Sequence, residues 1–295
     1  MTPNINIIKK TASFTAVILK GFGQIMLQEN QISGFLFLLG IFYGSFTMGL
    51  AALLATICGT ATAYVLKYDK SEIDKGLYGF SAALVGVAII LFLKPVILSW
   101  LLIILGSSLA TIIQHFFIKR KIPVFTLPFV LVTWAMLYFV HTYFTEIIHV
   151  SSIINVATFD YFTIGFRGFG QVIFQDNLVS GLLFFIAVFI SSPISALYGF
   201  AGAILSAIIA FKLSAPIHDI SIGLFSFNAV LCAIVFAGNQ IKDGIWVLLS
   251  VLLSLFVSIF MVKFNFIQLT FPFVLASCVV LFFKKLFVNQ KQMGY

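Results

Sequence analysis

The side chains best suited to chemistry in this chain occur twice, at matching positions of its two halves. Each half has a glutamine in a glycine-rich stretch, a phenylalanine followed four residues later by a leucine, and a threonine two residues before a proline. The pairs are Gln24 and Gln171, Phe80 and Phe227, Leu84 and Leu231, and Thr126 and Thr270. Amide and hydroxyl oxygens accept hydrogen bonds without carrying charge. These residues therefore predict the lining of a path for a small, neutral, polar molecule.

Three stretches carry these pairs, and they recur in the same order. The stretch GFGQIMLQENQISG (21–34) returns as GFGQVIFQDNLVSG (168–181), with eight of fourteen positions identical. GLYGFSAAL returns as GLFSFNAVL at the same spacing of 147 residues, and TLPFVL returns as TFPFVL at a spacing of 144. Chance alignment of apolar sequence would not repeat Gln, Asn, Thr and Pro together, so we interpret each half as one structural repeat.

The composition indicates a membrane protein that must hold these residues on apolar helices. Of the residues, 61% are hydrophobic and only 9% are charged, whereas a soluble domain has about 25% charged residues. The stretch 32–66 contains no Asp, Glu, Lys or Arg. It has room for two membrane-spanning helices of about 20 residues each, with a tight turn near Gly44 and Ser45.

Apolar segments divide both halves in the same way. Each half begins with a segment rich in amides, which a lipid-facing helix would not tolerate, so we expect a helix that re-enters the protein instead of spanning the bilayer. The leading segments are 7–30 and 158–177; the longer ones are 33–47, 49–66, 76–93, 95–118 and 125–145, then 179–193, 195–211, 222–239, 245–262 and 265–283. The predicted fold is an all-α polytopic membrane protein in which each repeat has five transmembrane helices and one re-entrant pore helix.

Basic residues predict how the two repeats are oriented. Five spans is an odd number, so the second repeat (149–295, with a cytoplasmic C-terminal tail) should be inverted relative to the first (1–148). With both termini in the cytoplasm, thirteen of the seventeen basic residues fall on the cytoplasmic side, as the positive-inside rule requires. The net charge of +8 thus indicates membrane topology, and we expect no nucleic-acid partner.

The remaining reactive residue types give no sign of an enzyme or of an ion-coupled pump. Almost every Asp and Glu lies between apolar segments or at their ends, and none of the four histidines recurs in the other half. Cys58, Cys232 and Cys278 form no C-x-x-C pair, and we interpret them as small buried hydrophobic residues. We expect no catalytic residue, no metal and no cofactor.

Each duplicated element also has an interpretation without a solute. Thr-x-Pro alone is compatible with a kinked helix, and Phe and Leu four residues apart are typical of packing on one helix face. Glutamine can bridge helices inside a bundle. A membrane scaffold without transport activity, or a channel for ammonia, water or another small neutral solute on the same framework, therefore stays open as an alternative. Duplication of all four elements favours a lined pore.

Taken together, the stretches RGFGQVIFQDN, SGLLFFIAVFISSP, GLYGFSAALVG and GLFSFNAVL and the two T-x-P-F motifs resemble the urea transporter family, over about residues 21–283. The resemblance implies passive, channel-like conduction of urea, a homotrimer in which each protomer has its own pore, and a cell-membrane location (the inner membrane in a bacterium). The family's pore is a narrow slot with oxygen atoms along one wall and aromatic rings facing the solute.

The resemblance also implies roles for particular residues. Carried over by position, Phe80 and Leu84 line one constriction and Phe227 and Leu231 the other, Thr126 and Thr270 lie midway, and Gln24 and Gln171 stand near the oxygens. Two positions depart from the family pattern. The aromatic residue three places after the first glutamine is Leu27 here, whereas Phe174 retains it, and the asparagine that follows the first-half phenylalanine is Ser81, whereas Asn228 retains it.

Overall fold

The computed structural model describes residues 5–149 and 160–293, and this part of the chain is built from helices. The first half contains α1 (Ile5–Gln24), α2 (Gln31–Gly44), α3 (Phe46–Val65), α4 (Lys70–Asp74), α5 (Phe80–Phe92), α6 (Ile97–Lys119), α7 (Leu127–Tyr143) and the 3₁₀ turn η1 (Thr145–Ile147). The second half contains α8 (Tyr161–Gln171), α9 (Leu178–Ser191), α10 (Pro193–Lys212), α11 (Ile217–Ser221), α12 (Phe227–Phe236), α13 (Ile241–Lys263) and α14 (Phe271–Met293).

The helices repeat in order, and several pairs have equal lengths. α2 and α9 both have 14 residues, α3 and α10 both have 20, and α6 and α13 both have 23. Even the five-residue helices α4 and α11 correspond, although both lie outside the apolar segments predicted from the sequence. The chain thus builds one succession of helices twice.

The unusual backbone conformations repeat as well. Most residues avoid positive φ angles, because the side chain then crowds the backbone. Left-handed residues nevertheless occur at the same points of both halves, in the pairs Leu27 and Phe174, Lys67 and Ser214, Gly76 and Gly223, Lys121 and Asn265, and Phe125 and Leu269. The similarity between the halves therefore extends to individual turns of the backbone.

Polar caps set where the helices begin. The side chains of Asn30 and Asn177 accept hydrogen bonds from the first backbone N–H groups of α2 and α9, which otherwise have no partner within the helix. Ser45 and Ser192 do the same for α3 and α10. The turn between α2 and α3 lies at Ser45, where the sequence predicted a tight turn.

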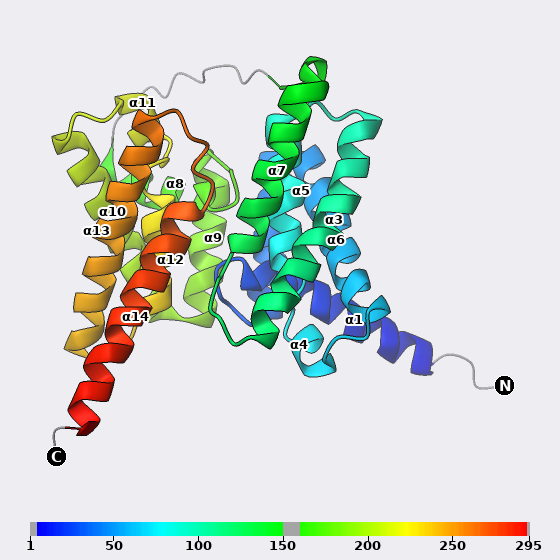
Figure 1. Cartoon of the computed structure of the whole chain (residues 1–295), viewed down its shortest axis with the longest axis horizontal. Coiled ribbons are helices and arrows are strands. Elements are labelled where there is room, and N and C mark those ends of the chain that lie inside the picture. The colour runs from blue at the N-terminus through cyan, green and yellow to red at the C-terminus, as the bar shows by residue number, and fades with distance from the viewer. Residues whose placement is uncertain (1–4, 150–159, 294–295) are drawn as a thin grey trace. The chain divides into compact units, whose positions relative to one another are not determined.

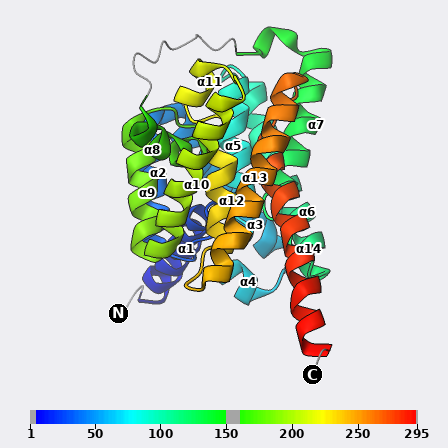
Figure 2. The ribbon, with the colours of Figure 1, turned by 90° about the vertical axis from the view of Figure 1, so that its left-hand side faces the viewer.

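Contacts divide the chain into two compact units. The first consists of Met1–Ile122 and Leu131–Ser151, and the second of Pro123–Val130 and Ser152–Tyr295. In the first unit α3, α5 and α6 lie side by side (Figure 1). In the second, α10, α12 and α13 are neighbours and α14 runs along α13 (Figure 2).

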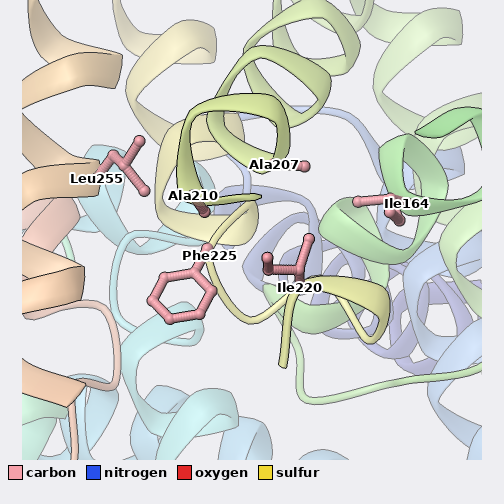
Figure 3. Close-up of a cluster of buried hydrophobic side chains, with 6 residues drawn as sticks. All are labelled: Ile164, Ala207, Ala210, Ile220, Phe225 and Leu255. Atoms are coloured by element: carbon pink, nitrogen blue, oxygen red, sulfur yellow. The ribbon is translucent and has the colours of Figure 1, made fainter. Parts of the chain in front are cut away.

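Each unit has a hydrophobic cluster built at equivalent positions. In the second unit the cluster joins Ile164 of α8, Ala207 and Ala210 of α10, Ile220 of α11, Phe225 and Leu255 (Figure 3). In the first unit, Val17, Ala63, Ile73 and Tyr78 are the equivalents of Ile164, Ala210, Ile220 and Phe225. Among these four shared positions, one pair differs in polarity, because Tyr78 has a hydroxyl group and Phe225 has none.

Glycine permits a close approach of backbone segments beside each cluster. Gly76 has φ +76° and lies so near Gly21 that a Cβ atom would come within 3.0 Å of the Gly21 backbone. Gly223, with φ +86°, lies in the same way against Arg167 and Gly168. Only glycine combines a positive φ with this separation at little cost.

Four described helices are long and apolar enough to cross a membrane: α3, α6, α10 and α13. Five further apolar helices have 10–17 residues. The predicted segments 76–93 and 222–239 are too long, because the left-handed Gly76 and Gly223 begin turns and the helices start only at Phe80 and Phe227. The 13 residues of α5 measure about 20 Å, against about 30 Å for the hydrocarbon core.

Candidate functional site

The shortest contact between two predicted site residues joins the threonines of the two T-x-P-F motifs. Thr126 Oγ1 and Thr270 Oγ1 lie 2.6 Å apart in the second unit, and both side chains are buried, with exposed fractions of 3% and 0%. One hydroxyl donates to the other, so the pair keeps one O–H proton and further lone pairs for a third partner. The structure therefore brings together two threonines that are 144 residues apart in the sequence.

Each of these threonines stands at the start of a helix. Thr126 directly precedes α7 and Thr270 directly precedes α14, so Pro128 and Pro272 occupy the second helical position. Proline fits there because the first N–H groups of a helix have no partner within it. The alternative that Thr-x-Pro marks a kink inside a helix is therefore wrong, since the preceding residues, Phe125 and Leu269, are left-handed.

The glutamine motif ends a helix in both halves. The N–H groups of Leu27 and Gln28 donate to the carbonyls of Gln24 and Gly23, at 3.1 and 2.9 Å. This pair of bonds is the Schellman arrangement, in which the chain leaves a helix through one left-handed residue. Phe174 and Gln175 repeat it on Gln171 and Gly170, at 3.1 and 3.0 Å. The motif therefore places Gln24 and Gln171 in the last turn of α1 and α8.

Bulky residues occupy the left-handed positions of this motif, where glycine is usual. Leu27 has φ 59° and Phe174 has φ 56°. Leu27 is 39% exposed, whereas the Phe174 ring lies 6.2 Å from that of Phe129. Residues with a strained backbone are common at functional sites. The positive φ angles at positions 27 and 174 therefore support their place among the candidate site residues.

The two glutamines differ in their surroundings. Gln24 is partly exposed, and its Nε2 donates to the backbone carbonyl of Lys75 at 3.0 Å, which ties α1 to the end of α4. Gln171 is 8% exposed. The next glutamines along the chain, Gln28 and Gln175, fold back to donate to the carbonyls of Met26 and Ile173. The sequence did not indicate a structural role for Gln28 and Gln175, although they occur at matching positions of the two halves.

The phenylalanine and leucine pairs lie on the first turns of two short helices. Phe80 and Leu84 are the first and fifth residues of α5, and Phe227 and Leu231 are the first and fifth of α12. Residues four apart share a helix face. Their exposed fractions are 7% and 0% in α5, and 2% and 0% in α12. Each pair thus consists of two buried apolar side chains at the beginning of a helix, and that helix is buried along nearly all its length.

An asparagine that sequence reasoning did not include among the site residues joins α12 to the start of α14. Asn228 Nδ2 donates to the Leu269 carbonyl at 3.3 Å, and Asn228 Oδ1 accepts from the Phe273 N–H at 3.2 Å. A second link runs from Gln268 Nε2 to the Leu224 carbonyl, at 3.1 Å. The repeat of GLYGFSAAL as GLFSFNAVL was the signal that could have pointed to Asn228, because position 228 follows the duplicated phenylalanine.

Charged and titratable groups gather at the end of the first unit, near α4. The Tyr78 hydroxyl donates to the Glu72 carboxylate and lies 2.8 Å from His115 Nδ1, while the Tyr68 ring stacks on His115 at 3.5 Å. Burial raises the pKa of Tyr78, and the Glu72 carboxylate adds to the effect. The second unit has Phe225 and Ile259 at the positions equivalent to Tyr78 and His115, so it lacks this network.

None of the ten predicted site residues is ionisable. Among the described residues, no group of three or more His, Cys, Asp and Glu side chains could hold a metal ion. Buried hydroxyl, amide and phenyl groups can bind and orient a neutral molecule. The described part of the chain is a helical membrane protein whose candidate site residues carry no charge.

Comparison with known proteins identifies the family. The profile of the urea transporter family matches residues 15–285, and the chain belongs to that family. Urea transporter 1 of Rattus norvegicus is 32% identical over 238 residues, which cover 75% of this chain and 62% of that protein. The Urea transporter 1 proteins of Mus musculus and Capra hircus are each 31% identical, over 75% and 76% of this chain. The chain spans less than two thirds of the length of these curated relatives, 62% or 63%.

Proposed function

We propose that this protein conducts urea passively across a membrane, through a narrow and uncharged pore. The observation that carries the proposal is the buried pair of hydroxyls at Thr126 and Thr270, 2.6 Å apart, which come from equivalent motifs in the two halves. Membership of the urea transporter family supports urea as the solute. The relatives' names support the same substrate class.

The chemistry of urea suits such a pore. Urea is flat and neutral, with N–H donors on both amino groups and one carbonyl acceptor. A row of oxygen acceptors would replace the water that these N–H groups lose, so dehydration would cost less. Phenyl rings on both faces would select a flat molecule, and an ion would lose its hydration without meeting a compensating charge.

We assign roles to the predicted residues on this basis. Thr126 and Thr270 offer hydroxyl oxygens midway along the pore, and Gln24 and Gln171 add amide oxygens. The apolar residues form the narrow parts on either side, namely Phe80, Leu84 and Leu27, and Phe227, Leu231 and Phe174. Burial of the phenylalanine and leucine pairs of α5 and α12 supports this assignment, because residues of a narrow passage have little accessible surface.

The proposal includes the topology of the two repeats in the membrane and the oligomeric state of the protein. We infer that the repeats 1–148 and 149–295 are inverted relative to one another, each with five spans and one re-entrant helix, and that the pore runs between them. Both termini then face the cytoplasm, and the protein works as a homotrimer in the cell membrane. The bias of basic residues and the one-to-one match of helices α1–α7 with α8–α14 support this arrangement.

Flux measurements on liposomes test the proposal. Wild-type protein should release urea faster than protein-free vesicles, and Thr126→Val or Thr270→Val should lower urea flux roughly fivefold, because valine keeps the shape and removes one hydrogen-bond acceptor. Thr142→Val is the matched control, since Thr142 is an exposed residue of α7 whose hydroxyl donates to the carbonyl of Tyr138. Wild-type urea flux equal to that of empty vesicles contradicts the function, and flux of ammonia or water without urea would indicate a different solute.

A further inference from the structure

We propose that Asn228 is a positioning residue that holds the Thr270 hydroxyl in place. The inference rests on the proposed function, because it assigns Asn228 to the same threonine pair. Asn228 is 1% exposed and follows Phe227 on α12. Its side chain reaches the residue before Thr270 and the third residue after it. The threonine is therefore held between two bonds made by one amide group.

The start of α14 shows what this amide supplies. The first backbone N–H groups of a helix need partners from outside it. Phe271 N–H donates to the Gln268 carbonyl at 3.0 Å, and Pro272 has no N–H group. The N–H group of the third helical residue, Phe273, donates to Asn228 Oδ1. Asn228 thus completes the hydrogen bonding of the first turn of α14 from another helix, while Thr270 keeps its hydroxyl for Thr126.

The other end of the amide fixes the backbone that precedes Thr270. Leu269 has φ 43°, a conformation that a branched side chain resists. Asn228 Nδ2 donates to the carbonyl of this residue at 3.3 Å. Without that bond, the strained turn would be free to relax and the Thr270 side chain would turn with it. A shift of a few tenths of an ångström would change the Thr126–Thr270 bond.

The first half of the chain provides a natural comparison. Position 81, equivalent to 228, is a serine whose hydroxyl donates to Gln114 Oε1 on α6 at 3.3 Å. The position equivalent to Gln114 is Ser258, whose buried hydroxyl has no partner among the described residues. In the first half the amide group belongs to Gln114 on α6, and in the second half it belongs to Asn228 on α12. These two helices are not equivalent, because α6 corresponds to α13 and α5 corresponds to α12. The pair of Ser81 and Gln114 indicates that this fold accepts a serine at the position of Asn228 when a glutamine occupies the position of Ser258.

Two variants at positions 228 and 258 test the role of Asn228. Asn228→Ser removes the cap of α14, and Asn228→Ser with Ser258→Gln rebuilds the serine–glutamine pair of the first half without restoring the cap. We expect the melting temperature to fall in the single variant and to recover in the double variant. Urea flux should stay lowered roughly fivefold in both, with a lower ratio of urea to water permeability. Asn239→Ser, at an exposed position before α13, is the control and should match the wild type.

A double-mutant cycle separates positioning from a general structural role. If Asn228 acts through the Thr270 hydroxyl, Asn228→Ser should have no further effect on urea flux in a Thr270→Val background. Equal fold losses in the two backgrounds overturn the inference, and so does wild-type urea flux in the Asn228→Ser, Ser258→Gln variant. These outcomes leave the proposed function standing, whereas absence of flux in the wild-type protein overturns the function itself.

Discussion

At the scale of single residues, position 27 is the clearest difference between the two copies of the site. Leu27 and Phe174 share one backbone conformation, with φ 59° and 56°. The larger ring is therefore compatible with the turn at position 27. Sequence reasoning found both positions from their spacing after the glutamines, but it could not predict the left-handed backbone, because leucine and phenylalanine have no preference for it.

Leu27→Phe should change selectivity and leave stability unaltered. Phenylalanine adds a ring to one proposed constriction, so flux of bulkier analogues such as methylurea or thiourea should fall more than flux of urea. Competition of labelled urea uptake by each analogue, measured on liposomes, gives the comparison. Equal reduction of all solutes would contradict a role in discrimination by shape, and a large fall in melting temperature would indicate that position 27 does not resemble position 174.

Tyr78→Phe should lower stability by about 1–2 kcal/mol, since it removes two buried hydrogen bonds of the phenol. The backbone accepts phenylalanine, as the equivalent Phe225 demonstrates. Thermal unfolding in detergent measures the loss, and Phe225→Leu is a control for the apolar contribution of the same position. Unchanged stability would mean that the contacts with Glu72 and His115 contribute nothing.

The same phenol predicts a dependence on pH. The pKa of Tyr78 is raised in the folded protein, so the protonated phenol contributes stability that is fully present below its ordinary value of 10.0 and is lost as pH rises above it. Wild-type melting temperature should therefore decline more steeply above pH 10 than that of Tyr78→Phe. Parallel curves for the two proteins would contradict this linkage.

At the scale of helices and turns, the sequence predicted most segments but misplaced several ends. Apolar runs located the long helices, because a run of apolar residues is a direct consequence of membrane burial. The sequence could not show that α5 and α12 begin four and five residues later than the predicted segments, since those starts depend on Gly76 and Gly223 packing against the backbone of another helix. The short helices α4 and α11 have too few residues for a periodic pattern.

Gly76→Ala and Gly223→Ala should each destabilise the protein by roughly 2 kcal/mol or more, because the new methyl group meets both a positive φ and a neighbouring backbone. Gly244→Ala is the matched control. A Cβ atom there would touch only the Tyr198 hydroxyl, at 3.4 Å, and alanine favours the helix. The melting temperatures of the purified proteins test this prediction. Equal values for Gly76→Ala and Gly244→Ala would show that the structure around Gly76 accommodates the methyl group without loss of stability.

At the scale of the whole molecule, the sequence predicted a duplicated helical membrane protein, and the paired helices agree in number and order. The candidate site was predicted from pairs of residues at matching positions of the two halves, and it stays a prediction. Asn228 was missed because its equivalent is Ser81, so duplication alone gave no reason to select it. Its contacts with Leu269 and Phe273 depend on the meeting of α12 and α14, which no local pattern encodes.

Labelling from outside the cell tests the inverted orientation. In a cysteine-free background, a cysteine at position 94 or 263 should react with a membrane-impermeant maleimide in intact cells, because five spans per repeat with both termini in the cytoplasm would put both positions outside. Cysteines at positions 120 and 242 should react only after the membrane is opened. Labelling of position 120 in intact cells would contradict the orientation of the first repeat, and labelling of position 242 would contradict that of the second.

The differing lengths of α5 and α12 have a consequence for the origin of the chain. α5 has 13 residues and α12 has 10. This difference accounts for the change of spacing from 147 residues at Phe80 and Phe227 to 144 at Thr126 and Thr270. A single gain or loss of about one helical turn therefore separates the two copies from position 21 to position 131.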